Sequence, residues 1–464
     1  MTTNAKTLRA KRIRSPFYEP WSFGNAIKDG NWATKLSILI MGFGNLVHGQ
    51  IIKALLFFSM QVLFIFYMLT KGIPDLMMLP SLGTQEMVET WNPEKMIYEY
   101  TVGDNSVLIL LWGVVAICMI ITFFFIWRNT VKSAYKAEYL KKQGIKPNSF
   151  QEDIYDLFDV KIHNLLLVLP VTGILIFTIL PLIYMISMAF TSYSRIDDRL
   201  ILFDWVGLEN FKTVLTPGGT VGSAFWPVLG WTIIWAILAT VLNFLLGLGL
   251  TELINRKTTR AKGLWRVLFS LTIAIPQFIS LLVIRTMLGP NGAINELLRN
   301  DWGLITTSLP FLTNPTWARV TVIVVNLWVG IPYTLLQVTG ILQNMPEEYE
   351  EAARIDGANA WIIFLKIKLP YIFFITTPYL ITQFTGNINN FNVIYLLSGG
   401  GPGRPNSTAG FTDLLVTWLY KLTIDNQYYN IGAVIGIFTF ITLSVVALIT
   451  YRSSGSYKDE EAFQ

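Results

Sequence analysis

The sequence predicts an all-α polytopic membrane protein, and three observations lead to this fold class. Hydrophobic residues make up 53% of the 464 residues and charged residues only 14%, whereas an average soluble domain has about 25% charged residues. Eight stretches are apolar over roughly 20 residues, the length of helix that crosses the hydrocarbon core of a bilayer. Lys and Arg gather in alternate connecting segments, as they do in cytoplasmic loops.

The eight apolar stretches are predicted to be transmembrane helices, because a spanning segment satisfies its backbone hydrogen bonds in lipid only within itself. They lie at 52–70, 107–127, 164–190, 227–250, 265–288, 320–342, 371–397 and 430–451. A further apolar stretch at 36–48 is interrupted by Gly42, Gly44 and Asn45. As a ninth span it would reverse the orientation of every later loop, so we expect an interfacial helix that leads into the first span.

The distribution of basic residues predicts that both termini face the cytoplasm. Seven Lys and Arg residues precede the first span, seven lie between the second and third spans, and five lie in 251–266. The segment 72–106 after the first span holds only Lys95 among six acidic residues. Because basic residues mark cytoplasmic loops, the net charge of +5 reports membrane topology, and no nucleic acid is expected as a partner.

Two blocks are expected along the chain. Residues 1–160 comprise a cytoplasmic N-terminal arm, the first two transmembrane helices and a basic connector, and residues 161–464 a six-helix core with a structured loop at 343–370. The external loops of the core are too short for a folded domain with its own core, so a separate capture protein is expected outside the membrane. In the last loop, Arg404 and Asp413 are weaker candidates for contacts with that protein, with a solvated loop as the alternative. The loops lie at 191–226, 290–318 and 399–428.

Motifs for covalent chemistry are missing from the sequence. It contains no phosphate-binding glycine loop, no His-Glu-x-x-His zinc pattern and a single cysteine, so we expect neither an enzyme nor a cofactor in this chain. Ion-coupled carriers need ionisable residues at membrane depth. Those of the spans lie near span ends, where long side chains reach the interface: Lys53, Glu252, Arg266 and Arg285. A self-contained secondary carrier or channel is the alternative from another class.

Neutral polar residues form a row on each of two spans. In the sixth span, spacings of four, three and four place four residues on one helical face: Asn326, Gly330, Tyr333 and Gln337. In the seventh span a similar spacing joins Tyr379, Gln383, Asn387 and Asn390. Such rows suit a wet cavity for a neutral sugar, whose hydroxyl groups need donors and acceptors, although amides also bond helix to helix. Three prolines are expected to bend spans five to seven and open internal space: Pro276, Pro332 and Pro378.

The loop at 343–370 is predicted to contain a short helix. Pro346 suits the first turn of a helix, and the acidic residues that follow favour its positive end: Glu347, Glu348, Glu350 and Glu351. Gly357 is placed to end the helix in a left-handed cap. Ala352 and Ala353 leave a flat surface on which another protein could dock. The segment 358–368 is expected to pack on the bundle before Pro370 restarts the chain into the seventh span.

The residues of this loop resemble the EAA loop of ABC importer membrane subunits. The order Glu351-Ala352-Ala353, three residues, Gly357, nine residues, Ile367-x-Leu369-Pro370 matches the signature of that family. Further stretches are similar, in the same order, to the larger permease of maltose and maltodextrin importers, the MalF type. They are NLWVGIPY at 326–333, NINNF at 387–391, GGGP at 399–402 and TDLL at 412–415.

The resemblance implies a type I importer permease with eight transmembrane helices in a bacterial plasma or inner membrane. It implies four kinds of partner: a second permease, two cytoplasmic ATPases that bind ATP and Mg²⁺, an external sugar-binding protein, and an oligosaccharide, most simply a maltodextrin. Raffinose-type sugars and glycerol phosphate are the alternative solutes. The family's ATPase contacts fall on Glu351, Ala352, Ala353 and Gly357. Its sugar contacts fall on Asn326, Gly330, Tyr333 and Asn387. Gln383 stands where the family has a small hydroxyl residue, and the loop 191–226 is short where some members insert a domain.

Overall fold

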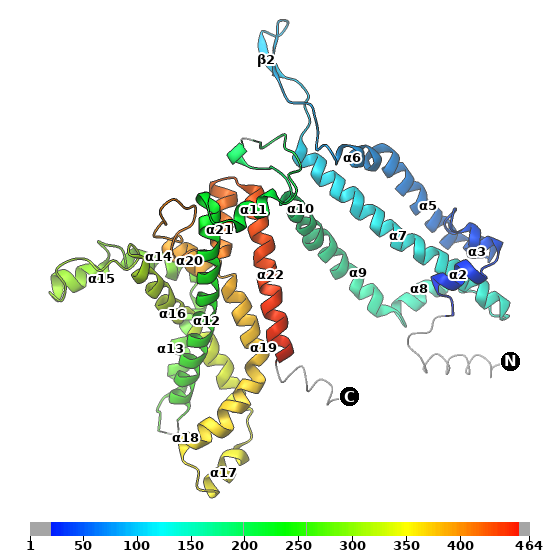
Figure 1. The fold of residues 1–464 in the computed structure, drawn as a ribbon. Helices are drawn as coiled ribbons and strands as arrows, with labels where there is room; N and C mark the ends of the chain where they lie inside the picture. The colour runs from blue at the N-terminus through cyan, green and yellow to red at the C-terminus, as the bar shows by residue number, and fades with distance from the viewer. Residues whose placement is uncertain (1–19, 198, 257, 454–464) are drawn as a thin grey trace. The chain divides into compact units, whose positions relative to one another are not determined.

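A computed structural model describes residues 20–197, 199–256 and 258–453, so residues 1–19 of the basic N-terminal arm lie outside the described part (Figure 1). Internal contacts divide the chain into two compact units. The first comprises Met1–Ser187 and Leu200–Trp205, and the second Met188–Arg199 and Val206–Gln464. The third span thus falls in the first unit, whereas the boundary expected at residue 160 assigns it to the second block.

The first unit is built from helices and one β-hairpin. Two π-helical turns, η1 and η2, join neighbouring helices into long continuous ones. The helices are α2 (Phe23–Asp29), α3 (Trp32–Leu36), α4 (Phe43–Val47), α5 (Ile51–Tyr67), η1 (Met68–Gly72), α6 (Ile73–Met78), α7 (Ser106–Lys142), α8 (Phe150–Phe158), α9 (Ile162–Ile174), η2 (Leu175–Ile179) and α10 (Leu180–Met188).

The stretch expected to form one interfacial helix forms two short helices instead. α3 ends at Leu36 and α4 begins at Phe43, with turns between them. Gly42 has a φ of +85°, and a Cβ there would lie 2.6 Å from the Ala54 carbonyl oxygen. The left-handed glycine and this close approach prevent a continuous helix, so the single-helix prediction was wrong. Neither helix is long enough to span a membrane, in agreement with the rest of that prediction.

A β-hairpin between α6 and α7 was missed by the all-helical prediction. Strands β1 (Glu89–Asn92) and β2 (Ile97–Tyr100) pair in antiparallel register. Trp91 lies opposite Tyr98, and their ring centroids are 5.0 Å apart. Aromatic cross-strand pairs of this kind stabilise short hairpins. The segment 72–106 is therefore a folded excursion rather than a plain connection.

The regular elements of the second unit in its described part are all helices, apart from isolated β-bridges. Its first elements are η3 (Arg195–Asp197), α11 (Glu209–Leu215), α12 (Gly219–Asn255), α13 (Lys262–Ala274), α14 (Gln277–Met287), α15 (Ala293–Glu296), η4 (Leu297–Asp301) and α16 (Pro315–Gln343). Its later elements are α17 (Glu347–Ile355), α18 (Ala360–Ile363), η5 (Phe364–Lys368), α19 (Leu369–Ile388), α20 (Phe391–Ser398), α21 (Leu415–Tyr420), η6 (Lys421–Asp425) and α22 (Tyr429–Ser453).

Each of the eight predicted spans coincides with helix. Seven helices of the described residues are long and apolar enough to cross a membrane, and the pair α13 and α14 adds an eighth span if it is counted as one. The pair is bent by 89° at the break that contains Pro276, where proline removes a backbone donor. Pro332 and Pro378 instead lie inside the unbroken helices α16 and α19.

The core of the second unit forms around α12, which packs against α16 and α19. Trp231 and Trp235 of α12 are buried there with Leu281, Val325 and other apolar side chains. Small residues permit the close approach of α12 and α16: a Cβ on Gly247 would lie 2.6 Å from the Thr334 Cβ. Close contact at small residues is typical of helices packed in membranes. The two rows of polar residues predicted on spans six and seven are therefore carried by helices that adjoin the same central helix.

Candidate functional site: the EAA loop, the polar rows and a buried polar cluster

Helix α17 forms the predicted short helix of the loop 343–370. It begins after Pro346 and carries Glu347, Glu348 and Glu350 in its first turn, where acidic side chains interact favourably with the positive end of a helix. Pro346 lies at the N-cap position rather than inside the first turn. The helix prediction is confirmed with that shift of one residue.

Gly357 ends α17 in the left-handed conformation that the sequence predicts. Its φ is +82°. The Ala358 N–H donates to the Ala353 carbonyl oxygen at 2.9 Å, and the Gly357 N–H donates to that of Arg354 at 3.1 Å. This pair of bonds is the Schellman arrangement, in which the left-handed residue is usually glycine. The turn after α17 is therefore fixed by backbone bonds.

The exposed face of the loop differs from the flat two-alanine surface expected from sequence. Glu351, Ala352 and Gly357 are exposed, but Ala353 is buried against the rest of the unit. Large apolar side chains extend this exposed face, with Ile355 86% and Trp361 66% exposed. Neither side chain was expected in this role from the sequence. The sequence does show large apolar residues within and just after a strongly acidic helix, and this pattern could have indicated their exposure.

The chain does not restart at Pro370. Helices α18, η5 and α19 follow one another without a break, and Asn359 caps the series by accepting a 2.9 Å hydrogen bond from the Ile362 N–H. Pro370 lies in the first turn of α19, directly after the π-helical turn η5. A π turn changes the local hydrogen-bonding pattern, and the helix continues through the proline. The segment after Gly357 is thus the beginning of the seventh span.

A cavity of about 1050 Å³ lies behind α17. Its walls come from the ends of α12 and α16, from α17 and from α18, and they include Glu252, Arg256, Glu350 and Lys368. Backbone packing between α17 and the spans is sparse. Side-chain ion pairs cross this region: Lys368 Nζ lies 2.9 Å from Glu350 Oε1 and 3.6 Å from Glu252 Oε2.

The row on α16 divides between a packed part and an exposed part. Asn326 is 3% exposed, and Gly330 lies against Asn243 of α12 so closely that an added Cβ would overlap the amide. Tyr333 is 49% exposed. Among the described residues, Asn243 Oδ1 and Asn326 Nδ2 are buried without a hydrogen-bond partner, which is costly for amides. Asn243 was not singled out from the sequence.

The row on α19 is mostly bonded within the chain. Asn387 Nδ2 donates to Thr240 Oγ1 at 3.0 Å, and Trp235 Nε1 donates to the Asn387 carbonyl oxygen at 3.1 Å. Asn390 caps α20 through a 3.2 Å bond from the Val393 N–H. Gln383 is half-buried. In this structure, helix-to-helix bonding therefore accounts for the Asn387 side chain, whereas Tyr333 and Gln383 have surface open to other groups.

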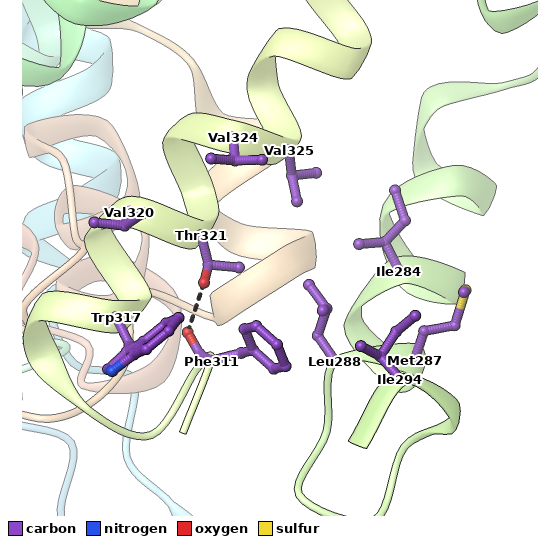
Figure 2. Close-up of a pocket in the computed structure, with 10 residues that line it drawn as sticks. All are labelled: Ile284, Met287, Leu288, Ile294, Phe311, Trp317, Val320, Thr321, Val324 and Val325. Carbon is purple, nitrogen blue, oxygen red and sulfur yellow. Dashed lines mark hydrogen bonds between the residues drawn. The ribbon is translucent and has the colours of Figure 1, made fainter. Parts of the chain in front are cut away.

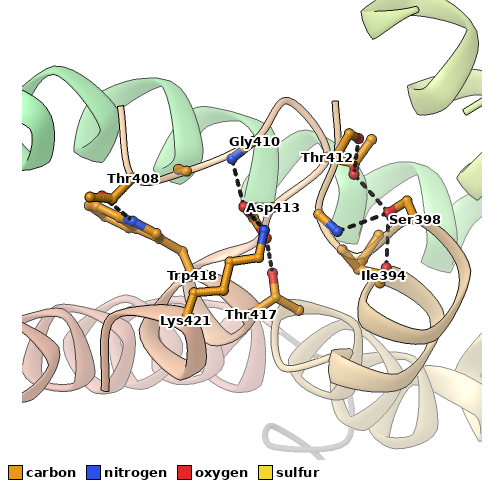
Figure 3. Close-up of polar contacts among 12 residues, drawn as sticks. Ile394, Ser398, Thr408, Gly410, Thr412, Asp413, Thr417, Trp418 and Lys421 are labelled. Atoms are coloured by element: carbon orange, nitrogen blue, oxygen red, sulfur yellow. Dashed lines mark hydrogen bonds and ion pairs between the residues drawn. The ribbon is translucent and has the colours of Figure 1, made fainter. Parts of the chain in front are cut away.

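Two of the signature stretches meet in a buried polar cluster between α20 and α21 (Figure 3). Thr412 Oγ1 donates to the Gly401 carbonyl oxygen at 2.7 Å, which joins 399–402 to 412–415. Asp413 is fully buried and accepts bonds from the Gly410 N–H at 2.6 Å, Thr417 Oγ1 at 3.0 Å and Lys421 Nζ at 2.8 Å. Asp413 has no surface for a binding protein, so that candidate contact was wrong.

Arg404 also belongs to this polar cluster. Its Nε donates to the Gly410 carbonyl oxygen at 3.0 Å, and its guanidinium lies 4.7 Å from the centroid of the Phe411 ring. Burial lowers the pKa of Arg404, and the nearby positive charge of Arg319 acts in the same direction. Arg404 is therefore packed into the loop and half-buried, rather than free in solvent.

An apolar pocket of about 340 Å³ lies between α14 and the first turns of α16 (Figure 2). Its wall includes Ile284, Phe311, Trp317 and Val324. The hydroxyl of Thr321, which also lines it, donates to the Phe311 carbonyl oxygen at 2.9 Å. A lining of this kind offers a sugar few hydrogen-bonding groups, so this pocket does not fit a carbohydrate site.

Comparison with known proteins gives consistent results. The sequence profile of the family described as "Binding-protein-dependent transport system inner membrane component" matches residues 243–454. The chain is 34% identical to the galactooligosaccharides transport system permease protein GanP of Bacillus subtilis, over 77% of this chain and 85% of that protein. It is 32% identical to the maltodextrin transport system permease protein MalC of Streptococcus pneumoniae, over 92% of this chain and 97% of that protein.

The fold is shared with a solved bacterial ABC transporter. Two crystal structures of a transporter that imports the acidic polysaccharide alginate contain a chain similar to this one, the second in complex with an alginate pentasaccharide-bound periplasmic protein. The TM-scores are 0.52 and 0.53, the identities 22% and 23%, and each match covers 65% of this chain and 97% of the other. At these identities the likeness concerns the fold alone.

Proposed function

Because this chain belongs to the family of binding-protein-dependent transport system inner membrane components, we propose that it carries an oligosaccharide, most simply a maltodextrin, across the membrane. The chain is a multi-pass permease subunit of an ABC importer in the plasma membrane and has no catalytic role of its own. Such permeases work with a second permease, with ATPases and with a substrate-binding protein.

The observation that carries the coupling part of the proposal is the exposed face of α17. Glu351, Ala352 and Gly357 present a small, rigid surface, and Ile355 and Trp361 add apolar side chains of the kind that anchor protein interfaces. We assign this face, with Ala353 packed beneath it, to the contact with a cytoplasmic ATPase. Two ATPase subunits would bind ATP and Mg²⁺, so this chain needs neither. Closure of the ATPases would then move α17 and, through it, the spans.

The substrate part of the proposal rests on the polar rows and on the relatives. Tyr333 and Gln383 are open to a ligand, and Asn326, Gly330 and Asn387 lie deeper in the same bundle. Amide and hydroxyl groups match the donors and acceptors of a neutral sugar. Relatives named for maltodextrin and for galactooligosaccharides support an oligosaccharide over a small charged solute. Glycerol phosphate is disfavoured because neither row carries a basic residue to neutralise its charge.

The complete importer provides the test of this function. The chain would be reconstituted in liposomes with its second permease, ATPases and binding protein, and uptake of labelled maltotriose would be measured with and without ATP. We expect uptake that requires ATP and every partner. Gradient-driven uptake by this chain alone would instead support the secondary carrier. Competition with unlabelled galactooligosaccharide or raffinose would identify another sugar class.

The Asn387 assignment is tested against a matched packing variant. Asn387→Ala removes both a possible sugar contact and the bond to Thr240, whereas Thr240→Val removes only that bond. We expect Asn387→Ala and Tyr333→Phe to lower uptake about two- to tenfold while Thr240→Val retains most of it, since one lost hydrogen bond to a ligand is worth about 0.5–1.5 kcal/mol. Equal losses for Asn387→Ala and Thr240→Val would assign Asn387 to helix packing.

A further inference from the structure

Lys368 joins the helix of the EAA loop to two spans. Its ammonium group contacts the carboxylate of Glu350 on α17 at 2.9 Å and that of Glu252 in the last turn of α12 at 3.6 Å. Lys368 itself is the last residue of η5, which continues directly into α19. One positive charge therefore connects α17 and η5 with α12, which is distant from both in sequence.

This connection lies where other contacts are few. The cavity of about 1050 Å³ separates α17 from the ends of α12 and α16, and Lys368, Glu350 and Glu252 all line it. Ala353 is the buried residue of α17, so apolar packing holds that helix at one place. The side chains of Lys368, Glu252 and Glu350 are 18%, 23% and 27% exposed, and charges that are partly shielded from water interact more strongly than exposed ones.

Glu252 and Glu350 both form ion pairs with Lys368. Within the described chain, Glu252 Oε1 is buried without a hydrogen-bond partner, so Lys368 is the cation that compensates the charge of Glu252. Glu350 has a second partner, Arg354, at 3.0 Å on its own helix. Loss of the Lys368 charge would leave Glu350 attached to α17 alone and would leave Glu252 uncompensated at the end of α12.

We propose that Lys368 is a positioning residue that makes α17, α12 and the beginning of α19 move as one body when the ATPases close. The inference rests on the proposed function, because it concerns the efficiency with which ATPase closure reaches the spans. Lys368 touches neither the sugar nor ATP in this scheme. Helix α12 carries Trp235, which bonds Asn387 of α19, so the joined elements include those that surround the deep end of the polar rows.

The first test measures coupling in the reconstituted importer with Lys368→Met, which keeps an apolar stem of similar length and removes the charge. Exposed Lys366, two residues earlier in η5, gives the matched control Lys366→Met. We expect Lys368→Met to assemble with the ATPases in normal yield and to hydrolyse ATP, but to transport at least fivefold less sugar per ATP. Lys368→Arg should restore the ratio, and Lys366→Met should leave it unchanged.

The outcomes separate the alternatives. An unchanged ratio for Lys368→Met overturns the positioning role, and so does a loss of assembly or melting temperature that explains the whole defect. If the unaltered complex shows no ATP-dependent uptake at all, the proposed function fails instead, which is a different result.

A second measurement follows the helices directly. Spin labels would be attached to cysteines at Leu253 of α12 and Tyr349 of α17, both exposed, after replacement of the single native cysteine, Cys118. We expect the distance between the labels to stay narrow on ATP binding in the unaltered complex and to broaden in Lys368→Met. A distribution that is the same in both proteins overturns the inference, whatever the transport assay gives.

Discussion

Gly400 lies so close to the Asp413 carboxylate that a Cβ added to Gly400 would overlap it. The φ of Gly400 is +77°, a conformation that side chains disfavour. Asp413 in turn is fully buried and bonded to Gly410, Thr417 and Lys421. The requirement for glycine at this position therefore comes from a buried carboxylate in another stretch of the sequence.

Replacement of Gly400 should loosen the buried polar cluster between α20 and α21. We expect Gly400→Ala to lower the melting temperature of the purified chain in detergent, because both the overlap with Asp413 and the positive φ oppose a side chain; overpacking of this kind costs about 1–3 kcal/mol. Gly403→Ala is the control, since a Cβ there meets nothing within 4 Å. Equal melting temperatures for the two variants would contradict the prediction.

Substitutions of Asp413 and Lys421 should have strongly non-additive effects on stability, because the two side chains form an ion pair. Lys421→Met leaves a buried carboxylate uncompensated, which typically costs about 3–5 kcal/mol. Asp413→Asn combined with Lys421→Met should lower the free energy of unfolding less than Lys421→Met alone, because no unpaired charge stays in the polar cluster. Melting temperatures of the single and double variants form the double-mutant cycle. Additive effects would show that the pair does not matter to stability.

The close packing of α12 against α16 can be tested by a second substitution that restores the stability lost in the first. We expect Gly330→Ala to destabilise the chain by about 1–3 kcal/mol, because the new methyl group overlaps the Asn243 amide. Asn243→Ala makes room for it, so the double variant should regain most of the lost stability. Gly340→Ala on the same helix is the control, with nothing within 4 Å of its added Cβ. Thermal unfolding measures all four proteins, and failure of the double variant to recover would refute the packing explanation.

Gly357 should matter to ATPase binding mainly through its backbone. A side chain in the left-handed region costs about 1–2 kcal/mol for most residues, but asparagine tolerates it. We expect Gly357→Glu to release the ATPase subunits during purification, since the bulky acid is strained and also opposes the negative end of α17. Gly357→Asn should retain them. Release by both variants would indicate that the surface itself must be free of any side chain.

The spans and the turn after α17 were predictable because strong local constraints determine them. Lipid allows a spanning backbone no partners except in its own helix, so the eight apolar stretches identify helices directly. Gly357 follows an acidic helix start at a suitable distance, and its left-handed φ of +82° was expected from residue type alone. Pro276 breaks the fifth span as a missing backbone donor predicts.

Features that depend on distant partners were not predictable. Asp413 was considered for an exposed role because a loop carboxylate is usually solvated; its burial depends on Gly410 and Lys421 together. The spacing of Asn387 is compatible with a sugar path or with a helix contact, and its bond to Thr240 could be seen only in three dimensions. Pro370 suggested a break, but the π turn η5 carries the helix through it.

The unbroken helix from Ala360 to Ile388 has a mechanical consequence. At a rise of about 1.5 Å per residue it is a stiff rod of roughly 44 Å, and a tilt of about 10° around its midpoint would displace each end by roughly 4 Å. Within the described residues, helix is continuous from the end that bears Trp361 to the end that bears Asn387. A small push on one tip would thus reach the amides at the other with its direction reversed: the segment would act as a lever rather than a tether.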